Sequence, residues 1–395
     1  MNPEIYGELE KGIEGPWIQE VLQEMILIRS ENPFHETPSA GFREKEMADY
    51  LSERMSSMGL RVEQREVRPQ RPNVFGCLDG KEGNFTLMLA GHMDTARTEG
   101  YPDAYSGRSE QGIIYGRGAC DMKAALAAYL AVAKVIRDGA LTLKGNLILC
   151  GNMDEEFQML GSKAIGREGP RADQGIIGEP TGLQICPSNK GRVSTKIVTR
   201  GRAAHSSVPE QGVNAVERMA HVIHAFEDYN EELLHRPPHA LCGHGRFTPG
   251  VIRGGVQVNM VPDFCELEVD RRTLPGESKE GVYEEFCSRI EKVKARVPDL
   301  VYEITEPTWL IAPNDISPEE PVVKALRRAH LAVTHRDPEI QAFPAGSDAP
   351  YMGFPTVICG PGSIAQAHTT REFVSLEEAV LAAKLYLHVV LDLLG

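Results

Sequence analysis

The fold is decided by the stretch FTLMLAGHMDT, residues 85–95. Residues 85–89 form a short apolar run, which predicts a buried β-strand. The strand closes on an Ala-Gly pair and so delivers His92 and Asp94 at its carboxyl end. In open α/β sheets, functional side chains lie at the carboxyl ends of the strands. We therefore expect this strand to present an imidazole and a carboxylate at one edge of a sheet.

The size and composition predict a globular protein of two domains. A chain of 395 residues exceeds one ordinary domain. Its net charge of −14 argues against nucleic acid and anionic membrane as partners, because both need a basic surface. The N-terminal stretch does not read as a signal peptide, and no run of about 18 apolar residues could span a membrane. The eight scattered cysteines favour free thiols, so we expect a cytoplasmic location.

Strands followed by acidic residues recur along the first half of the chain. Apolar runs at residues 146–150 and 175–178 predict buried strands that lead directly into acids. Another acid follows a glycine-rich loop and begins an Ala- and Leu-rich helix at residues 122–137. The acids in chain order are Asp121, Glu155, Glu156 and Glu179. Four strand-then-acid units in succession indicate an α/β fold with a mostly parallel sheet and helices on both faces.

The pattern changes over residues 191–310, where strands and helices follow the order β-α-β-β-α-β. This order is typical of a small α+β unit of the ferredoxin-like kind. The predicted strands span 192–199, 248–256, 264–272 and 301–305, and the predicted helices span 213–234 and 276–297. A helix at 318–335 and a strand at 356–359 then resume the first pattern. We predict a catalytic domain of residues 1–190 and 311–395, interrupted by an inserted domain of residues 191–310.

The chain offers two imidazoles and several carboxylates that suit a pair of divalent cations. The candidate ligand stretches end in His92, Asp94, Asp121, Glu155, Glu156, Glu179 and His368. Imidazole and carboxylate donors without thiolate suit Zn²⁺, Mn²⁺ or Co²⁺ at an open catalytic site. Glu155 and Glu156 are adjacent, so their side chains diverge, and one can bind metal while the other faces the substrate. The Asp94 side chain is expected to accept the imidazole N–H of His92 and fix its tautomer.

Each motif also has a purely structural interpretation. The His-x-Asp pair could be an ordinary strand-end turn, Asp121 a helix cap, Glu179 a surface acid and His368 a structural histidine. The ordered set, with the stretches placed where strands end, favours a dinuclear site over these separate interpretations.

The ordered motifs resemble those of a two-metal amidohydrolase and metallopeptidase family. Its members include acetylornithine deacetylase, succinyl-diaminopimelate desuccinylase, aminoacylase and glutamate carboxypeptidase. The motifs are GHMDT at 91–95, GRGACDMK at 116–123, DEE at 154–156, GEPT at 178–181 and AHT at 367–369. The resemblance implies that His92 and Glu179 hold one metal, that Glu156 and His368 hold the other, and that Asp121 bridges both.

The resemblance also implies roles for residues beyond the metal ligands. Glu155 would be the general base, and Asp94 would orient His92. The bond between Asp121 and Met122 would be a cis peptide. In the inserted domain, His205 would stabilise the oxyanion, usually from the partner subunit. Substrate contacts are implied for Asn259, Arg272, Gly346 and Ser347, the first two with the substrate carboxylate.

We therefore predict a metal-dependent hydrolase that cleaves the amide bond of an N-acyl amino acid. Two divalent ions are expected, with zinc foremost and cobalt or manganese as alternatives, in a homodimer. A dipeptidase or carboxypeptidase of the same family is one alternative. A non-catalytic metal- or peptide-binding relative is the other, but binding alone does not need the base Glu155.

Overall fold

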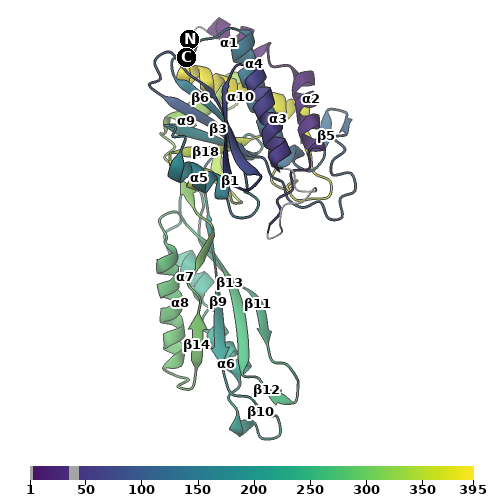
Figure 1. The fold of residues 1–395 in the computed structure, drawn as a ribbon. Helices are drawn as coiled ribbons and strands as arrows, with labels where there is room; N and C mark the ends of the chain where they lie inside the picture. The colour runs from purple at the N-terminus through teal and green to yellow at the C-terminus, as the bar shows by residue number, and fades with distance from the viewer. Residues whose placement is uncertain (1–2, 35–43) are drawn as a thin grey trace. The chain divides into compact units, whose positions relative to one another are not determined.

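The chain forms two compact units in a computed structural model that describes residues 3–34 and 44–395. Unit 1 comprises Met1–Ser188 and Asp315–Gly395, and unit 2 comprises Asn189–Asn314. Unit 2 is thus contiguous in sequence and interrupts unit 1 (Figure 1).

Two sequence expectations concern these limits. The insertion expected at residues 191–310 falls within unit 2, which takes in a few more residues at each end. The sequence also predicts a loop at residues 32–41 that interrupts the helical pattern of residues 17–58, and most of this loop lies outside the described residues.

Unit 1 is built on a nine-stranded mixed sheet, in the order β1-β2-β6-β3-β7-β18-β8-β16, with β17 paired to β8. The strands are β1 (Arg61–Arg68), β2 (Arg71–Leu78), β3 (Thr86–His92), β6 (Asn146–Asn152), β7 (Gln174–Pro180), β8 (Ile185–Asn189), β16 (Asn314–Asp315), β17 (Ile340–Phe343) and β18 (Thr356–Gly360). The central pairs β6–β3, β3–β7 and β7–β18 are parallel, whereas β1, β2 and β8 pair antiparallel with their neighbours. The fold is therefore α/β with a mostly parallel centre, as predicted.

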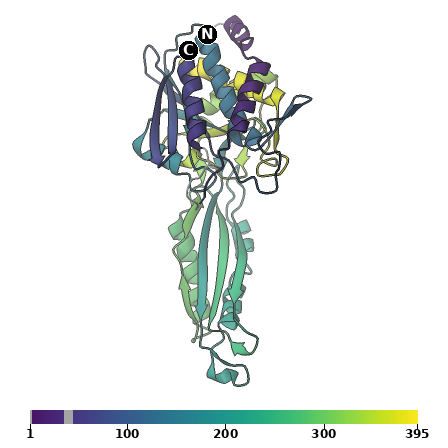
Figure 2. The same ribbon diagram turned by 45° about the vertical axis from the view of Figure 1, so that its right-hand side comes forward.

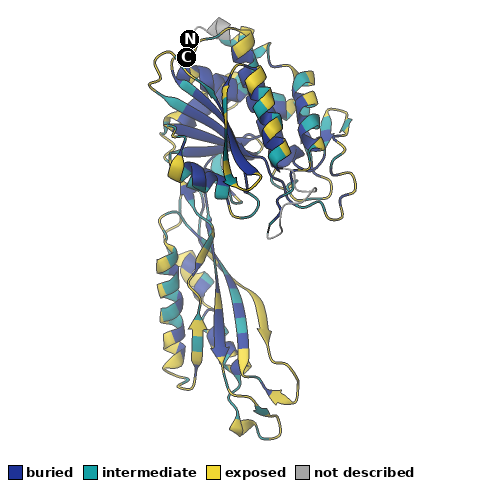
Figure 3. Cartoon of the chain, viewed as in Figure 1, coloured by how far each residue is buried: buried dark blue, intermediate teal, exposed yellow. Residues whose placement is uncertain are grey.

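Helices flank this sheet and bury its central strands, which are dark blue in Figure 3. The helices of unit 1 are α1 (Pro3–Glu10), α2 (Gly15–Leu27), α3 (Glu44–Ser57), α4 (Ala124–Asp138), α5 (Leu160–Glu168), α9 (Pro321–Thr334) and α10 (Leu376–Leu394). Helix α10 packs against α4 and α9 and is buried along most of its length. Within the described ranges, no helix is both long and apolar enough to cross a membrane.

Asp121 follows a glycine-rich loop and begins a helical segment, as predicted: it lies in a π-helical turn, Ala119–Lys123, that leads into α4. Its inclusion among the strand-then-acid units was wrong, because it follows no strand of the central sheet. A small separate sheet has the order β19-β5-β4 and is formed by Phe373–Ser375, Ile113–Tyr115 and Ser109–Glu110. Strands β4 and β5 precede Asp121 in the chain, whereas β19 comes from the C-terminal part. Gly118 reverses the chain with a φ of 84°, and a Cβ there would come within 2.9 Å of Thr95. Glycine is therefore needed at this turn.

Lys123 anchors this turn to helix α2. Its side chain is fully buried, and Nζ donates to the carbonyl oxygens of Met25 at 2.9 Å and Ile28 at 3.0 Å. These carbonyls lie at the C-terminal end of α2, where the helix runs out of N–H donors; the Met25 oxygen also accepts the backbone N–H of Ile28 at 3.2 Å. Burial lowers the pKa of Lys123 to about 7.

We expect Lys123→Ala to lower the free energy of unfolding of unit 1 by about 2–4 kcal/mol, because two buried carbonyls lose their donor. Urea unfolding followed by intrinsic fluorescence measures the change. Lys134→Ala is the control, since its ion pairs with Glu14 and Asp138 involve largely exposed acids and should contribute less than about 1 kcal/mol. Equal losses in the two variants would contradict the anchoring role.

Unit 2 carries the predicted β-α-β-β-α-β order. Its sheet runs β11-β13-β9-β14, all antiparallel, with β15 also on β9. The elements are β9 (Gly191–Arg200), α6 (Ala215–His224), α7 (Tyr229–His235), β11 (Arg246–Gly254), β13 (Phe264–Thr273), α8 (Lys279–Lys294), β14 (Val301–Ile304) and β15 (Thr308–Ile311). A two-stranded ribbon pairs β10 (Ala204–His205) with β12 (Met260–Val261). The helices cover one face of the sheet (Figure 2).

The single helix predicted at 213–234 is in fact two helices. Asn214 caps α6 by accepting the backbone N–H of Val216 and Glu217. Helix α6 ends at His224, and Phe226 then packs in an aromatic core. The ring centroids of Phe226 and Phe247 are 4.9 Å apart. Burial of this ring outweighs continuation of the helix.

Candidate metal centre

The first group of candidate ligands is His92, Asp121 and Glu179. The Nε2 atom of His92 lies 2.9 Å from Asp121 Oδ1 and 3.8 Å from Glu179 Oε1. One ligand atom from each residue lies within 4.8 Å of the others. Strands β3 and β7 are parallel neighbours, so their carboxyl ends bring His92 and Glu179 to the same edge of the sheet.

The second group is Asp121, Glu156 and His368, again within 4.8 Å of one another. The Nε2 atom of His368 lies 2.9 Å from Glu156 Oε2 and 3.6 Å from Asp121 Oδ2. Asp121 therefore belongs to both groups and directs one carboxylate oxygen to each. The peptide bond between Asp121 and Met122 is cis, as the family resemblance implies.

Residues at this edge fit divalent cations. Among the described residues, Glu156 Oε1 and Glu179 Oε1 are buried and have no hydrogen-bond partner. Burial raises the pKa of Glu179 well above its usual range. Burial also raises the pKa of Glu155, and the nearby negative charge of Glu179 raises it further. Several buried carboxylates with unsatisfied oxygens need positive charge, and the donor set of imidazole and carboxylate suits it.

The tautomer of His92 is set by Asp94, but through a different atom from the one expected. His92 Nδ1 lies 2.8 Å from the backbone oxygen of Asp94, whereas the Asp94 carboxylate is 3.8 Å away. A carbonyl oxygen only accepts, so Nδ1 donates its proton to it, and Nε2 is the ring nitrogen directed at Asp121 and Glu179. The carboxylate was predicted in this role, but the direction of the Asp94 carbonyl at the end of β3 cannot be read from the sequence.

The Asp94 carboxylate instead holds the two glutamates. Its Oδ1 accepts the backbone N–H of Glu155 at 3.1 Å, and its Oδ2 accepts that of Glu156 at 3.1 Å. Oδ2 also accepts the side-chain amide of Asn32 at 2.7 Å. Asp94 therefore positions the segment that carries the candidate base and one candidate ligand.

Glu372 supports Asp121 through contacts that were not predicted. Its Oε1 accepts the backbone N–H of Cys120 at 2.9 Å and of Asp121 at 3.0 Å, and Oε2 accepts Arg117 Nη1 at 2.5 Å. Glu372 is fully buried, 251 residues from Asp121 along the chain. The available signal was an acid directly before the short apolar strand at 373–375.

Three predicted site residues belong to unit 2. His205 is exposed on β10, and its Nδ1 accepts the backbone N–H of Ser207 at 3.2 Å. The backbone N–H of Ser207 always donates, so the neutral His205 ring carries its proton on Nε2. Asn259 is exposed before β12, and Arg272 Nε donates to Asp270 at 2.8 Å.

Gly346 and Ser347 lie in unit 1, in the loop after β17. Ser347 is fully buried, and its hydroxyl accepts the backbone N–H of Ala349 at 3.3 Å. The next residue, Asp348, is also fully buried and accepts Asn152 Nδ2 at 2.5 Å. Burial raises the pKa of Asp348 to about 6.

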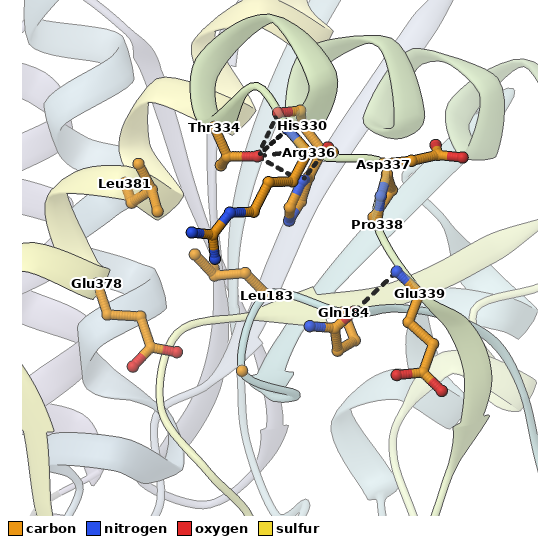
Figure 4. A pocket seen from close by; sticks show the side chains of 11 residues that line it. Leu183, Gln184, His330, Thr334, Arg336, Asp337, Pro338, Glu339, Glu378 and Leu381 are labelled. Carbon is orange, nitrogen blue, oxygen red and sulfur yellow. Dashed lines mark hydrogen bonds between the residues drawn. The ribbon is translucent and has the colours of Figure 1, made fainter.

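A separate hollow of about 580 Å³ lies elsewhere in unit 1 (Figure 4). It is lined by Gly182, Leu183, Gln184, His330, Thr334, Arg336, Asp337, Pro338, Glu339, Glu378 and Leu381. Its Asp337 side chain pairs with Arg327, and its His330 Nδ1 bonds to Thr334. None of the candidate metal ligands lines this hollow.

The fold and the clustered ligands together are those of a metal-dependent hydrolase that acts on amide bonds. The model of peptidase family M20/M25/M40 matches residues 88–392, well over half of the chain. The chain belongs to this family, which is metal-dependent.

Individual relatives agree with this membership. Acetylornithine deacetylase of Vibrio atlanticus is 31% identical over 362 residues, covering 89% of this chain and 92% of the relative. A Bacillus subtilis relative, N-formyl-4-amino-5-aminomethyl-2-methylpyrimidine deformylase, is 26% identical and covers 99% of this chain and 98% of the relative. Aminopeptidase PepT from Bacillus cereus shares the fold, with a TM-score of 0.80 at 21% identity and coverage of 97% of this chain and 99% of that chain.

Proposed function

We propose that the protein uses two divalent metal ions to hydrolyse the amide bond of an N-acyl amino acid. The observation that carries the proposal is the sharing of Asp121 by two ligand groups, with Glu155 beside them and in neither. His92 and Glu179 would hold one ion, Glu156 and His368 the other. Zinc is the proposed metal, with cobalt or manganese as alternatives, and the cytoplasm is the proposed location. The names of the deacetylase and deformylase relatives favour acyl removal.

The chemistry assigns separate tasks to the chain's own residues. When bound, two divalent cations lower the pKa of a water molecule and polarise the substrate carbonyl. Glu155 accepts the proton of the attacking water and returns one to the leaving amine. Burial and the nearby Glu179 raise the pKa of Glu155 above the usual range of a glutamate, which strengthens it as a base. Arg272 and Asn259 would hold the substrate carboxylate, with Gly346 and Ser347 lining the pocket.

His205 is the proposed donor to the developing oxyanion, supplied by the partner subunit of a homodimer. Its proton on Nε2 supports this role, because an oxyanion needs a donor. Strand β11 is an edge of the unit 2 sheet and offers a surface for dimerisation. Exposed apolar side chains on and near it are Val251, Ile252, Val256, Val258, Met260 and Phe264.

Mixing two inactive variants tests the contribution from the partner. We expect His205→Ala and Glu155→Gln homodimers, once dissociated and reassociated together, to regain about one quarter of wild-type activity. Half of the dimers are then mixed, and each holds one site with both groups intact. Reassociated samples of each variant alone are the controls, and sedimentation verifies the dimer. Absence of any recovery in verified mixed dimers would contradict the role in trans.

A substrate panel tests the function itself. The protein, loaded in turn with Zn²⁺, Co²⁺ and Mn²⁺, is assayed on N-acetyl, N-succinyl and N-carbamoyl amino acids and on dipeptides. We expect N-acyl amino acids to have the highest kcat/KM. Preference for dipeptides would replace the deacylase with a dipeptidase of the same family. No hydrolysis by protein with two metals per chain would favour a binding protein.

A further inference from the structure

Asn32 joins the ends of two strands behind the candidate base. Its side-chain nitrogen donates to Asp94 Oδ2 at 2.7 Å and to Asp154 Oδ1 at 3.0 Å. Its side-chain oxygen accepts the backbone N–H of Phe34 at 2.7 Å. Asn32, Asp94 and Asp154 are all fully buried. One amide group therefore bridges two buried carboxylates that follow β3 and β6.

Asp154 is the residue directly before the two glutamates and is held through its Oδ1 atom and its backbone N–H, whereas its Oδ2 atom is buried without a hydrogen-bond partner among the described residues. Its φ of 68° turns the chain sharply after β6. Arg71 Nη2 donates to its carboxylate at 2.8 Å, and Glu44 Oε1 accepts its backbone N–H at 3.2 Å. Arg71 and Glu44 also form a buried ion pair. The start of the Glu155–Glu156 segment is thus fixed by charged groups of β2 and α3.

We infer that Asn32 is a positioning residue for Glu155 and Glu156. Asp94 holds the backbone of both glutamates, and Asn32 ties Asp94 to Asp154 at the start of the same segment. Without the amide, two buried carboxylates would lose a shared donor and repel each other. Asp94 would then turn away from the two backbone N–H groups. This inference rests on the proposed function, because it gives Asn32 its effect through the base and a metal ligand.

The chain offers a matched control in Asn73. This asparagine is also buried, donates to the backbone oxygen of Gly161 at 2.9 Å and accepts the N–H of Met153 at 3.1 Å. It makes two buried hydrogen bonds near the same strand end, but touches neither Asp94 nor Asp154 through them. Loss of its side chain should lower stability without releasing the two glutamates.

The experiment compares Asn32→Leu with Asn73→Leu in three measurements. These are urea unfolding, calorimetric titration of metal-free protein with Zn²⁺, and kcat and KM on the best substrate of the panel. We expect both variants to lose stability. Asn32→Leu alone should lower kcat about 10–100-fold, leave KM within about threefold and weaken binding of one Zn²⁺, as loss of a ligand-orienting contact does.

A second pair of variants covers a failure to fold. Asn32→Asp keeps the shape and the acceptor for Phe34 but removes the donor, and Asn73→Asp is its match. The inference would be overturned if Asn32→Leu or Asn32→Asp kept the kcat and the Zn²⁺ affinity of the wild type. Equal losses of kcat in the Asn32 and Asn73 variants would also overturn it. If the wild type hydrolyses nothing but Asn32→Leu still weakens Zn²⁺ binding relative to Asn73→Leu, the proposed function fails and the positioning role stands.

Discussion

Glu155→Gln should lower kcat by about 10²–10⁴-fold while the protein keeps its fold and both metals. The amide cannot accept a proton from water, whereas it preserves the size of the side chain. The backbone N–H of residue 155 can still donate to Asp94, so Glu156 should stay in place. Steady-state kinetics with metal analysis by mass spectrometry measures both quantities.

Glu378→Gln is the matched control for this prediction. Glu378 lies in unit 1 at the start of α10, and burial raises its pKa too, but it belongs to neither ligand group. The control should keep the wild-type kcat. A Glu155→Gln variant that turns over at the wild-type rate would remove Glu155 from the role of base.

Asp121→Asn should reduce the metal content from two ions per chain to at most one and abolish measurable hydrolysis. Asp121 is shared by both ligand groups, and the substitution leaves only one oxygen that can bind a cation. The fall in kcat should exceed about 100-fold, the upper range for loss of a contact that merely orients a ligand. Metal analysis and the same kinetic assay measure the effect.

Asp173→Asn serves as the comparison, because Asp173 is exposed, belongs to neither ligand group, and accepts the backbone N–H of Thr86 at 2.7 Å. It should retain both metals and full activity. Two tightly bound ions and normal turnover in Asp121→Asn would disprove the bridging role.

The sequence predicted the parallel centre of unit 1 because β3, β6 and β7 are apolar runs that lead into candidate site residues. It also predicted the ordered elements of the insertion, where alternation and helical periodicity are clear. It did not predict the edge strand β1 or its buried neighbour β2; β1 consists mostly of charged residues and is only partly buried. Edge strands face water and carry a weak apolar signal.

The finer contacts of the site depended on information that a linear pattern lacks. Whether a histidine bonds to the carboxylate or the carbonyl of Asp94 depends on the backbone direction at the end of β3. The contact between Glu372 and Asp121 joins segments on opposite sides of the insertion. The sequence placed Lys123 in a motif, but its role became clear only from its hydrogen bonds to carbonyls at the end of α2.

The position of β18 between β7 and β8 has a consequence for synthesis of the chain. Strands β7 and β8 are synthesised before unit 2. Strand β18, which lies between them in the sheet, is synthesised only after the whole of unit 2. At about 5–20 residues per second, the gap in the sheet stays open on the order of ten seconds. During that time β7 and β8 expose backbone groups that invite wrong pairing. The nascent chain is therefore most vulnerable to aggregation while its insertion, contiguous in sequence, can already fold.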